Sequence, residues 1–456
     1  MKRGQSFSAT HGSRRVLGAF GVLLSAAAAL PVWALDFDQA YRAASENDAT
    51  IRAARSAADA GRERLPQARA QLLPNVSLSA GRTHNDLTSE TRNFLGQPVT
   101  TRSQYYSGSQ ALSVRQPIYR PLINASVRQA QAQLEDAEAA LERDEQALVT
   151  RVAEAYFDAL LARDQLSLVS AQKKTYTTQV DAARKGFAAG SGTRTDVDEA
   201  QARLDLTLAQ ELEAQQNVEF THRRLAVITG SEVDALAVLD VARFSPSAPV
   251  PASLDAWVER AERASPELAS LRAQVEAARL EIEKAQTGHK PTLDLVAQWS
   301  RTNSDSVTSV NSRYDNKTIG LQLSVPLYSG GYVSSTVRQA VAAHDRAREL
   351  LEAARRDLGV RVHREFRGVT EGVLRVAALE QAVRSADQAL LSNQKSFKAG
   401  MRTSLDVLNA EQQRILALRD LAQARYVYML SSLRLESLAG EDRQSIVTKV
   451  NGWLMP

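Results

Sequence analysis

The chain has 456 residues, with 56 Lys plus Arg against 52 Asp plus Glu, and no cysteine. The absence of cysteine excludes a disulfide framework, a thiolate zinc site, a cysteine nucleophile and the lipid-bearing cysteine of a lipoprotein. Residues 1–34 hold four bases and no acid, so the remaining 422 residues carry 52 charges of each sign. A chain without net charge argues against nucleic-acid binding, which needs a basic surplus on one face.

Residues 1–34 have the pattern of a secretory signal peptide. The four bases precede an apolar run from Val16 to Leu30, and the small-residue pattern Val32-Trp33-Ala34 follows. This run is shorter than the roughly 20 residues that span a bilayer, so a retained membrane helix is the weaker alternative. We predict cleavage after Ala34 and export of the rest. No later stretch reaches about 18 apolar residues, so no transmembrane helix is expected.

Two long segments without proline, residues 122–245 and 327–455, permit uninterrupted helix. Both are rich in Ala, Leu, Glu, Gln and Arg, which are strong helix formers. Apolar residues recur in steps of three, four and seven, as in the series Val127, Ala130, Leu134, Ala137, Leu141, Leu148 and Val152. The spacing predicts coiled-coil seams; the alternative is the core of an ordinary helical bundle.

An internal duplication organises the chain. The segment Val127-Arg128-Gln129-Ala130 recurs as Val337-Arg338-Gln339-Ala340, and the Phe-x-Ala-Gly turns that end at Gly190 and Gly400 are spaced by the same 210 positions. Such self-similarity indicates two equivalent structural units. We therefore divide the chain into a signal peptide at 1–34, a first repeat at 35–230, a linker or equatorial region at 231–251, a second repeat at 252–440 and a short C-terminal tail at 441–456.

Each repeat is predicted to contain a helix, a β-hairpin, a very long helix and a shorter helix. The first repeat has helices at about 37–73, 121–186 and 195–229, with strands at about 75–86 and 105–118. The second has helices at about 253–288, 331–396 and 405–439, with strands at about 292–303 and 317–328. A helix of some 66 residues is about 100 Å long. The two shorter helices of each repeat could stack end to end beside it.

The predicted strands alternate apolar and polar residues. Leu293, Leu295, Ala297 and Trp299 form one such series, which suits either a transmembrane β-strand or a soluble sheet packed on helices. Because the chain offers four strands and a barrel needs at least about eight, membrane strands would require an oligomer. A trimer would supply twelve strands. The polar segments Thr83 to Ser103 and Arg301 to Asn316 are predicted as exposed loops between the strands.

The duplicated order of elements, both Phe-x-Ala-Gly turns and the segment from Gly400 to Leu408 resemble the TolC family of Gram-negative outer-membrane channels. The resemblance covers about residues 37–440. It implies an α plus transmembrane β fold, in which a homotrimer forms a twelve-stranded barrel in outer-membrane lipid and an α-helical tunnel in the periplasm. It also implies partners, namely a periplasmic adaptor, or membrane fusion protein, and an inner-membrane ABC, RND or MFS transporter. The implied function is type I protein secretion or efflux of small molecules.

The resemblance also implies a gate at the helical tips. By position, Arg402 would be the arginine of the second tip and Thr195 and Asp196 its partners in the first. Phe397 stands where the resemblance implies a tyrosine, so the hydroxyl of that link is missing. Asp406 and Asn409 would line the pore constriction, which gives a trimer three carboxylates and three amides.

The residues alone leave plainer alternatives open for these positions. Asp406 and Asn409 are three apart and share a helix face, just after a glycine turn. Asp196 and Asp406 could equally be acids that favour the start of a helix through its dipole. Arg402 could be an ordinary exposed turn residue.

Nothing in the sequence indicates an enzyme. It has no Gly-x-x-x-x-Gly-Lys-Ser/Thr phosphate loop and no Gly-x-Ser-x-Gly elbow, and its six histidines include no close pair. We predict no cofactor and no metal site. The alternative to a channel is a secreted coiled-coil structural or adaptor protein, whose hairpins would form a small soluble domain.

Overall fold

The computed structural model describes residues 34–304 and 312–455. The predicted signal peptide, apart from Ala34, lies outside these residues. The first repeat contains α1 (Phe37–Asn47), α2 (Ala49–Arg62), α3 (Arg64–Ala70), β1 (Asn75–Arg92), β2 (Pro98–Tyr119), α4 (Pro121–Ala188) and α5 (Arg194–Thr229). The second contains α6 (Leu254–Ala264), α7 (Pro266–Gln286), η1 (Thr287–His289), β4 (Thr292–Ser304), β5 (Ser312–Ser324), α8 (Tyr332–Lys398) and α9 (Ser404–Leu438). The short strand β3 (Val238–Leu239) lies between the repeats, and α10 (Arg443–Asn451) and β6 (Leu454–Met455) follow them.

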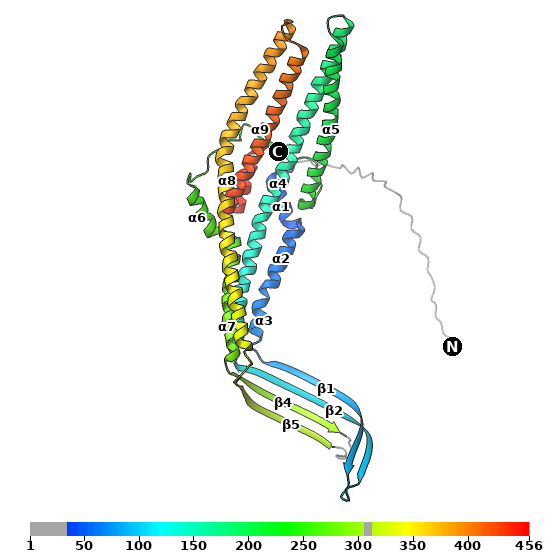
Figure 1. Ribbon diagram of the computed structural model, residues 1–456, viewed down its shortest axis with the longest axis vertical. Helices are drawn as coiled ribbons and strands as arrows, with labels where there is room; N and C mark the ends of the chain where they lie inside the picture. The colour runs from blue at the N-terminus through cyan, green and yellow to red at the C-terminus, as the bar shows by residue number, and fades with distance from the viewer. Residues whose placement is uncertain (1–33, 305–311, 456) are drawn as a thin grey trace, which may run out of the picture.

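The helices form one elongated body, as Figure 1 shows. The 68 residues of α4 give a helix of about 100 Å. Along its length α4 packs first on α2, α3 and α7 and then on α5, while α8 packs on α6, α7 and α9. The prediction that two shorter helices stack beside each long one is therefore confirmed. Both hairpins, α4/α5 and α8/α9, end at the same end of the body (Figure 1).

The first helix of each repeat was predicted as continuous, but the structure divides it into shorter helices, and local capping residues cause the breaks. Asp48 ends α1 and starts α2, where its Oδ1 accepts hydrogen bonds from the backbone N–H groups of Thr50 and Ile51. At the matching place Ser265 caps α7. Pro266 follows it at the first helical position, where its missing N–H costs nothing.

The strands also differ from the prediction in their ends. β1 and β2 continue to Arg92 and from Pro98, so the predicted loop from Thr83 to Ser103 shrinks to residues 93–97. Pairs such as Thr88 with Arg102 and Ser89 with Thr101 continue the ladder, because polar Thr and Ser side chains pair well across strands. β5 ends at Ser324, two residues before Pro326, which has no N–H for a ladder bond.

The C-terminal tail, for which we predicted no element, is ordered. Asp442 caps α10, whose Ile446, Val447 and Val450 are buried. β6 then pairs with β3 of the linker. The linker and the tail therefore pack together at mid-height on the helical body.

The core lies at this same level. Tyr156 of α4 is fully buried, and its hydroxyl donates to the backbone oxygens of Leu35 and Ala237 at 2.9 and 3.1 Å. Burial raises the pKa of the Tyr156 hydroxyl well above its usual range, so the group stays a donor. Phe37 packs edge-on to its ring. Leu148 and Val152, which belong to the predicted apolar seam of this helix, are buried in the same cluster.

The four longer strands form one antiparallel sheet in the order β1-β2-β4-β5, which leaves the helical body at an angle (Figure 1). An ion pair fixes this elbow. Arg120, which precedes α4, donates from Nε to Oδ1 of Asp294 on β4 at 2.8 Å, and from Nη2 to Oδ2. The Asp294 side chain is only 6% exposed, whereas that of Arg120 is 33% exposed.

We expect Arg120→Ala to destabilise the elbow, because it leaves the Asp294 carboxylate buried without its partner. Breaking a buried pair costs about 3–5 kcal/mol, and the partial exposure of Arg120 lowers the expected loss to about 1–3 kcal/mol. Thermal unfolding in detergent measures the loss. Arg102→Ala is the control, because Asp86, the partner of Arg102, is 38% exposed and the change should cost less than about 1 kcal/mol. Equal losses in both variants would contradict this account of the elbow.

Candidate functional site

One face of the sheet is mostly apolar in the half nearer the helices, where the row of Trp299 ends at Lys317. Cross-strand partners share a face, and the rows run Val76–Val114–Ala297–Ile319 and Leu78–Leu112–Trp299, with Leu295–Leu321 and Leu293–Leu323 nearer the helices. Ile319, Leu321 and Leu323 are each more than 60% exposed. No helix packs across either face of the described sheet (Figure 1). The alternative of a soluble sheet packed on helices is therefore not supported.

The opposite face is polar. Its rows run Ser77–Ser113–Gln298–Thr318 and Ser79–Ala111–Ser300–Asn316. The hydroxyls of Ser77 and Ser113 are 2.7 Å apart, and Asn85 donates to Ser107 at 2.9 Å. A sheet with one apolar and one polar face separates a nonpolar surrounding from water.

Both outer strands of the sheet are unpaired on one side. β1 pairs only with β2, and β5 only with β4, among the described residues. An open edge carries a row of unpaired N–H and C=O groups, which is a template for pairing with another strand. No helix in the described part of the chain has the length and apolarity needed to cross a membrane.

At the other end of the molecule, the two tip turns have the same backbone design. Gly190 and Gly400 take positive φ angles of 75° and 73°, which glycine adopts without strain. Thr193 and Thr403 then cap α5 and α9, each in a capping box with the acid three residues on. Asp196 and Asp406 thus do start helices, as the plainer alternative supposed.

A hydrogen bond links the two tips within one chain. The Ser404 hydroxyl donates to Oδ1 of Asp196 at 2.6 Å, while Oδ2 of Asp196 accepts from the Thr193 hydroxyl at 2.7 Å. These bonds, with that from Ser404 first, hold the pKa of the Asp196 carboxyl below its usual range. The sequence analysis named Asp196 but missed Ser404, because a serine beside a helix cap carries no distinguishing pattern.

Arg402 does not reach the first tip within one chain. Its Nη1 lies 3.4 Å from Oδ1 of Asp406 in its own turn, and the side chain is 58% exposed. Bonds from the Thr403 backbone and side chain, followed by Arg402, lower the pKa of the Asp406 carboxyl. Thr195 is exposed, as is Phe397 at 42%. The implied partnership of Arg402 with Thr195 and Asp196 is therefore not made inside the chain.

A second link between the hairpins lies one to two turns deeper and involves Asn409. Arg203 of α5 donates from Nη2 to Oδ1 of Asn409 at 2.7 Å, and from Nη1 to Oε1 of Gln412 at 2.8 Å. Arg203 was not predicted, because its distance from α9 depends on how the two helical hairpins pack.

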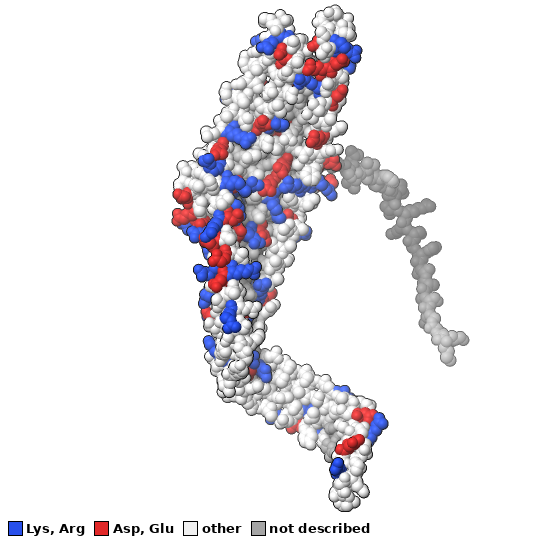
Figure 2. Space-filling view, viewed as in Figure 1, with Lys and Arg blue, Asp and Glu red and all other residues white. Residues whose placement is uncertain are grey.

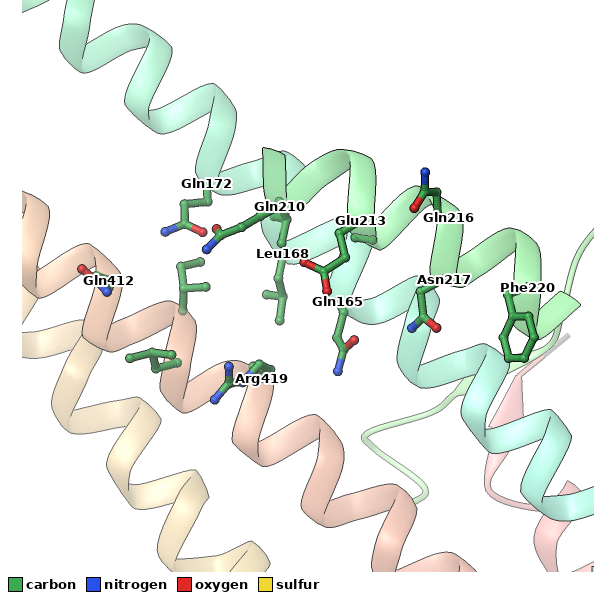
Figure 3. A pocket seen from close by; sticks show the side chains of 14 residues that line it. Gln165, Leu168, Gln172, Gln210, Glu213, Gln216, Asn217, Phe220, Gln412 and Arg419 are labelled. Atoms are coloured by element: carbon green, nitrogen blue, oxygen red, sulfur yellow. The ribbon is translucent and has the colours of Figure 1, made fainter. Parts of the chain in front are cut away.

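An open groove of about 600 Å³ runs between α4, α5 and α9. Figure 3 shows that side-chain amides line it together with the apolar residues Leu168 and Phe220 and the charged residues Glu213 and Arg419. The amides are those of Gln165, Gln172, Gln210, Gln216, Asn217 and Gln412.

The groove opens on the face that points away from the linker. Arg163 donates to the backbone oxygen of Leu236, and Tyr428 donates to that of Ser247, so both side chains face the linker. The groove residues Gln172 and Arg419 are each nine residues from them along α4 and α9. Nine residues are about two and a half helical turns, which places them on the opposite face.

In the described part of the chain, no group of three or more His, Asp or Glu side chains is arranged to hold a metal ion.

The comparison of sequences agrees with this architecture. A family model described as "Outer membrane efflux protein" matches residues 40–231 and 257–441. The alkaline protease secretion protein AprF of Pseudomonas aeruginosa is 36% identical over 429 residues, which are 93% of this chain and 88% of that protein. The outer membrane protein TolC of Vibrio cholerae is 34% identical over 446 residues, which are 96% of this chain and 97% of that protein.

Solved structures show the same fold. The outer membrane protein VceC of Vibrio cholerae superposes with a TM-score of 0.74 at 20% identity, covering 89% of this chain and 96% of that chain. The CmeC outer membrane channel of Campylobacter jejuni gives 0.77 at 15% identity, covering 91% and 89%. The matched family model, the relatives above 30% identity and the common fold agree, and the chain belongs to the TolC family of outer-membrane efflux and secretion channels.

Proposed function

We propose that three copies of this chain form one exit duct, which crosses the outer membrane through their shared strands and the periplasm through their helices. The single observation that carries this proposal is the sheet, with its apolar surface near the helices, its polar face and its two open edges. An open edge is not tolerated in lipid, so β5 of one copy must pair with β1 of the next. Residues 1–34 would direct export, and the two repeats would supply equivalent parts of the wall.

The polar face of the sheet and the amide groove would line the passage. The linker and the tail pack on the opposite side of the helices from the groove and would therefore lie outside the tunnel. Amide side chains offer both donors and acceptors without net charge. They suit a water-filled passage for chemically varied cargo.

We propose that the tips form the gate and that contact with partners opens it. Arg402, with its exposed side chain, would reach Thr195 or Asp196 of a neighbouring copy, and Phe397 would contribute no hydroxyl to this lock. Asp406 and Asn409 would face the constriction. A periplasmic adaptor and an inner-membrane ABC, RND or MFS transporter are the partners of this proposal.

The cargo we favour is protein, exported by type I secretion. Two of the relatives, AprF and PrtF, are named as protease secretion proteins and are 36% and 32% identical to this chain. Efflux of small molecules is the second candidate, supported by the description of the matched family. Cell supernatants and drug sensitivity of a deletion strain, complemented with this chain, separate the two.

Cysteine accessibility tests the duct, because the chain has no cysteine of its own. In planar bilayers, a bulky water-soluble thiol reagent should reduce the current through Gln298→Cys, whose side chain lies on the polar face. The neighbouring Ala297→Cys, on the apolar face, should not respond. Equal responses of the two variants would refute the duct. A second variant, Arg402→Ala, tests the gate. It should raise the current, because it removes the proposed contact of Arg402 with the neighbouring tip; a current at the wild-type level would refute that contact.

The link between the tips should be lost in acid. A carboxyl whose pKa is lowered in the folded state stabilises it above the ordinary aspartate pKa of about 4, and this contribution is lost as the pH falls through the lowered value. The pKa of Asp196 is lowered, first by the bond from Ser404 of the other tip. Single-channel current should therefore stay constant from about pH 7 to 5 and rise below about pH 4. The variant Asp196→Asn should already carry a larger current at neutral pH. If the current of Asp196→Asn still rises between pH 7 and 5, another group controls the gate and this link is contradicted.

A further inference from the structure

Four basic side chains gather on the apolar side of the sheet, toward its far end. They are Arg82 on β1, Arg301 on β4, and Arg313 and Lys317 on β5, and together they are called the basic belt here. Arg82 and Arg313 belong to one row, Arg82–Gly108–Asn303–Arg313, and Arg301 and Lys317 to the next two rows toward the helices. All four side chains are exposed.

The two faces of the sheet differ in charge. On the polar face, the described strands carry one base and one acid, Arg115 and Asp294. On the apolar face, every charged residue lies at or beyond the row that contains Trp299 and Lys317. Figure 2 shows one side of the molecule, on which charged side chains gather near the end of the sheet that is farthest from the helices. Charge on this face is therefore confined to the part of the sheet that is farther from the helices.

Most of this charge is uncompensated. Arg301 donates from Nη2 to Oδ2 of Asp315 at 2.9 Å. Arg82 has no ion-pair partner among the described residues and lies over the ring of Tyr106, with 4.9 Å from Cζ to the ring centroid. Arg313 forms no ion pair in the described part of the chain, and Lys317 acts electrostatically on the same Asp315 carboxylate that Arg301 binds. The belt thus presents a net charge of about three per copy, held on side chains that are free to bind an anion.

Two residues of the belt, Arg82 and Arg301, line an open hollow on this face. Gly108 lies between Arg82 and Asn303 in their row and has no side chain, which leaves an open hollow of about 500 Å³. Arg82, Tyr106, Gln110, Arg301 and Asn303 line it. Guanidinium groups and side-chain amides donate hydrogen bonds in the pattern that phosphate oxygens accept.

Aromatic residues mark the depth of the belt. Trp299 and Tyr106 lie on the apolar face at the two sides of the Arg301 row. In transmembrane strands, aromatic residues form girdles at the boundary between hydrocarbon and headgroups. The basic belt therefore lies at headgroup level, on the membrane side that is distal to the helices.

We propose that the basic belt binds the phosphate groups of lipid A in the outer leaflet. The proposal rests on the proposed function, because only a sheet inserted with its helices in the periplasm brings the belt to that leaflet. Pairing of β5 with β1 of the next copy would place Arg313 and Lys317 beside a neighbouring Arg82, so the belts of three copies would form a ring. A neutral or zwitterionic lipid offers no comparable match of charge.

Native mass spectrometry of the full-length detergent complex tests the proposal. Bis-phosphorylated lipid A should bind the wild type, while dephosphorylated lipid A and phosphatidylethanolamine should bind at least tenfold more weakly. The triple variant Arg82→Gln, Arg313→Gln, Lys317→Gln should lose about fivefold in affinity per removed charge, or roughly 100-fold in all. Lys317→Gln alone, the milder change, should lose about fivefold.

The control carries the same charge change on the helices, as Arg263→Gln, Arg356→Gln, Arg367→Gln, and should bind lipid A as the wild type does. Equal lipid A binding by the wild type and both belt variants would overturn the proposal. The proposal would also be overturned if inorganic phosphate alone saturated the belt at the same concentration as lipid A, because the ligand would then be a free anion. A wild type that forms no conducting complex would refute the proposed function instead.

Discussion

Replacing Leu321 by Arg should prevent the chain from accumulating as an outer-membrane complex. Leu321 lies in the middle of the apolar face, opposite Leu295, and is 68% exposed. An arginine near the bilayer midplane of a β-barrel costs about 2–4 kcal/mol. In a trimer the three copies add up to about 6–12 kcal/mol, which is comparable to the whole stability of an ordinary domain. Membrane fractionation followed by unheated gel electrophoresis should show the band of the complex lost.

The matched control is Gln322→Arg, one position along β5. Because successive side chains of a strand point to opposite faces, this arginine would lie on the polar face and keep its hydration. Its complex should assemble normally. If Leu321→Arg assembles as well as Gln322→Arg, the apolar face does not contact lipid.

Ser404→Ala should raise the single-channel current. The Ser404 hydroxyl donates to the Asp196 carboxylate and connects the two hairpins. A hydrogen bond to a charged group contributes about 1 kcal/mol when it is partly exposed, so three copies contribute about 3 kcal/mol. If the closed state is populated at about 99%, that loss shifts the equilibrium roughly 150-fold and opens somewhat more than half of the channels.

Ser191→Ala is the control for this variant. Ser191 lies in the first tip turn, and its hydroxyl donates to the backbone oxygen of Gly186 in the same turn. Its loss should leave the current unchanged, because no contact between the hairpins is removed. An increase in both variants would indicate a general loosening of the tips, and no increase in either would exclude this bond from the gate.

The sequence predicted those features that depend on local periodicity. Alternation along β4 identified both faces of the sheet, because a strand presents every second residue to one side. Gly190 and Gly400 predicted the tip turns, since their φ angles are positive there. The absence of proline over 124 residues permitted α4 to run without a break.

The contacts between distant segments could not be predicted in this way. Ser404 meets Asp196, and Arg203 meets Asn409, only because two hairpins some 200 residues apart lie side by side. The pairing of β6 with β3 depends likewise on a tail and a linker that have no periodic pattern. Arg402 was assigned a partner by resemblance, and within one chain it bonds to Asp406 instead.

The mass of the detergent-solubilised complex tests the shared wall most directly. Native mass spectrometry of the purified, exported protein should give three chains per particle, since four strands from each are needed to close twelve around one polar passage. The same sample should conduct in planar bilayers. A single chain per particle, with both edge strands of its sheet open to hydrogen exchange in the micelle, would contradict the account.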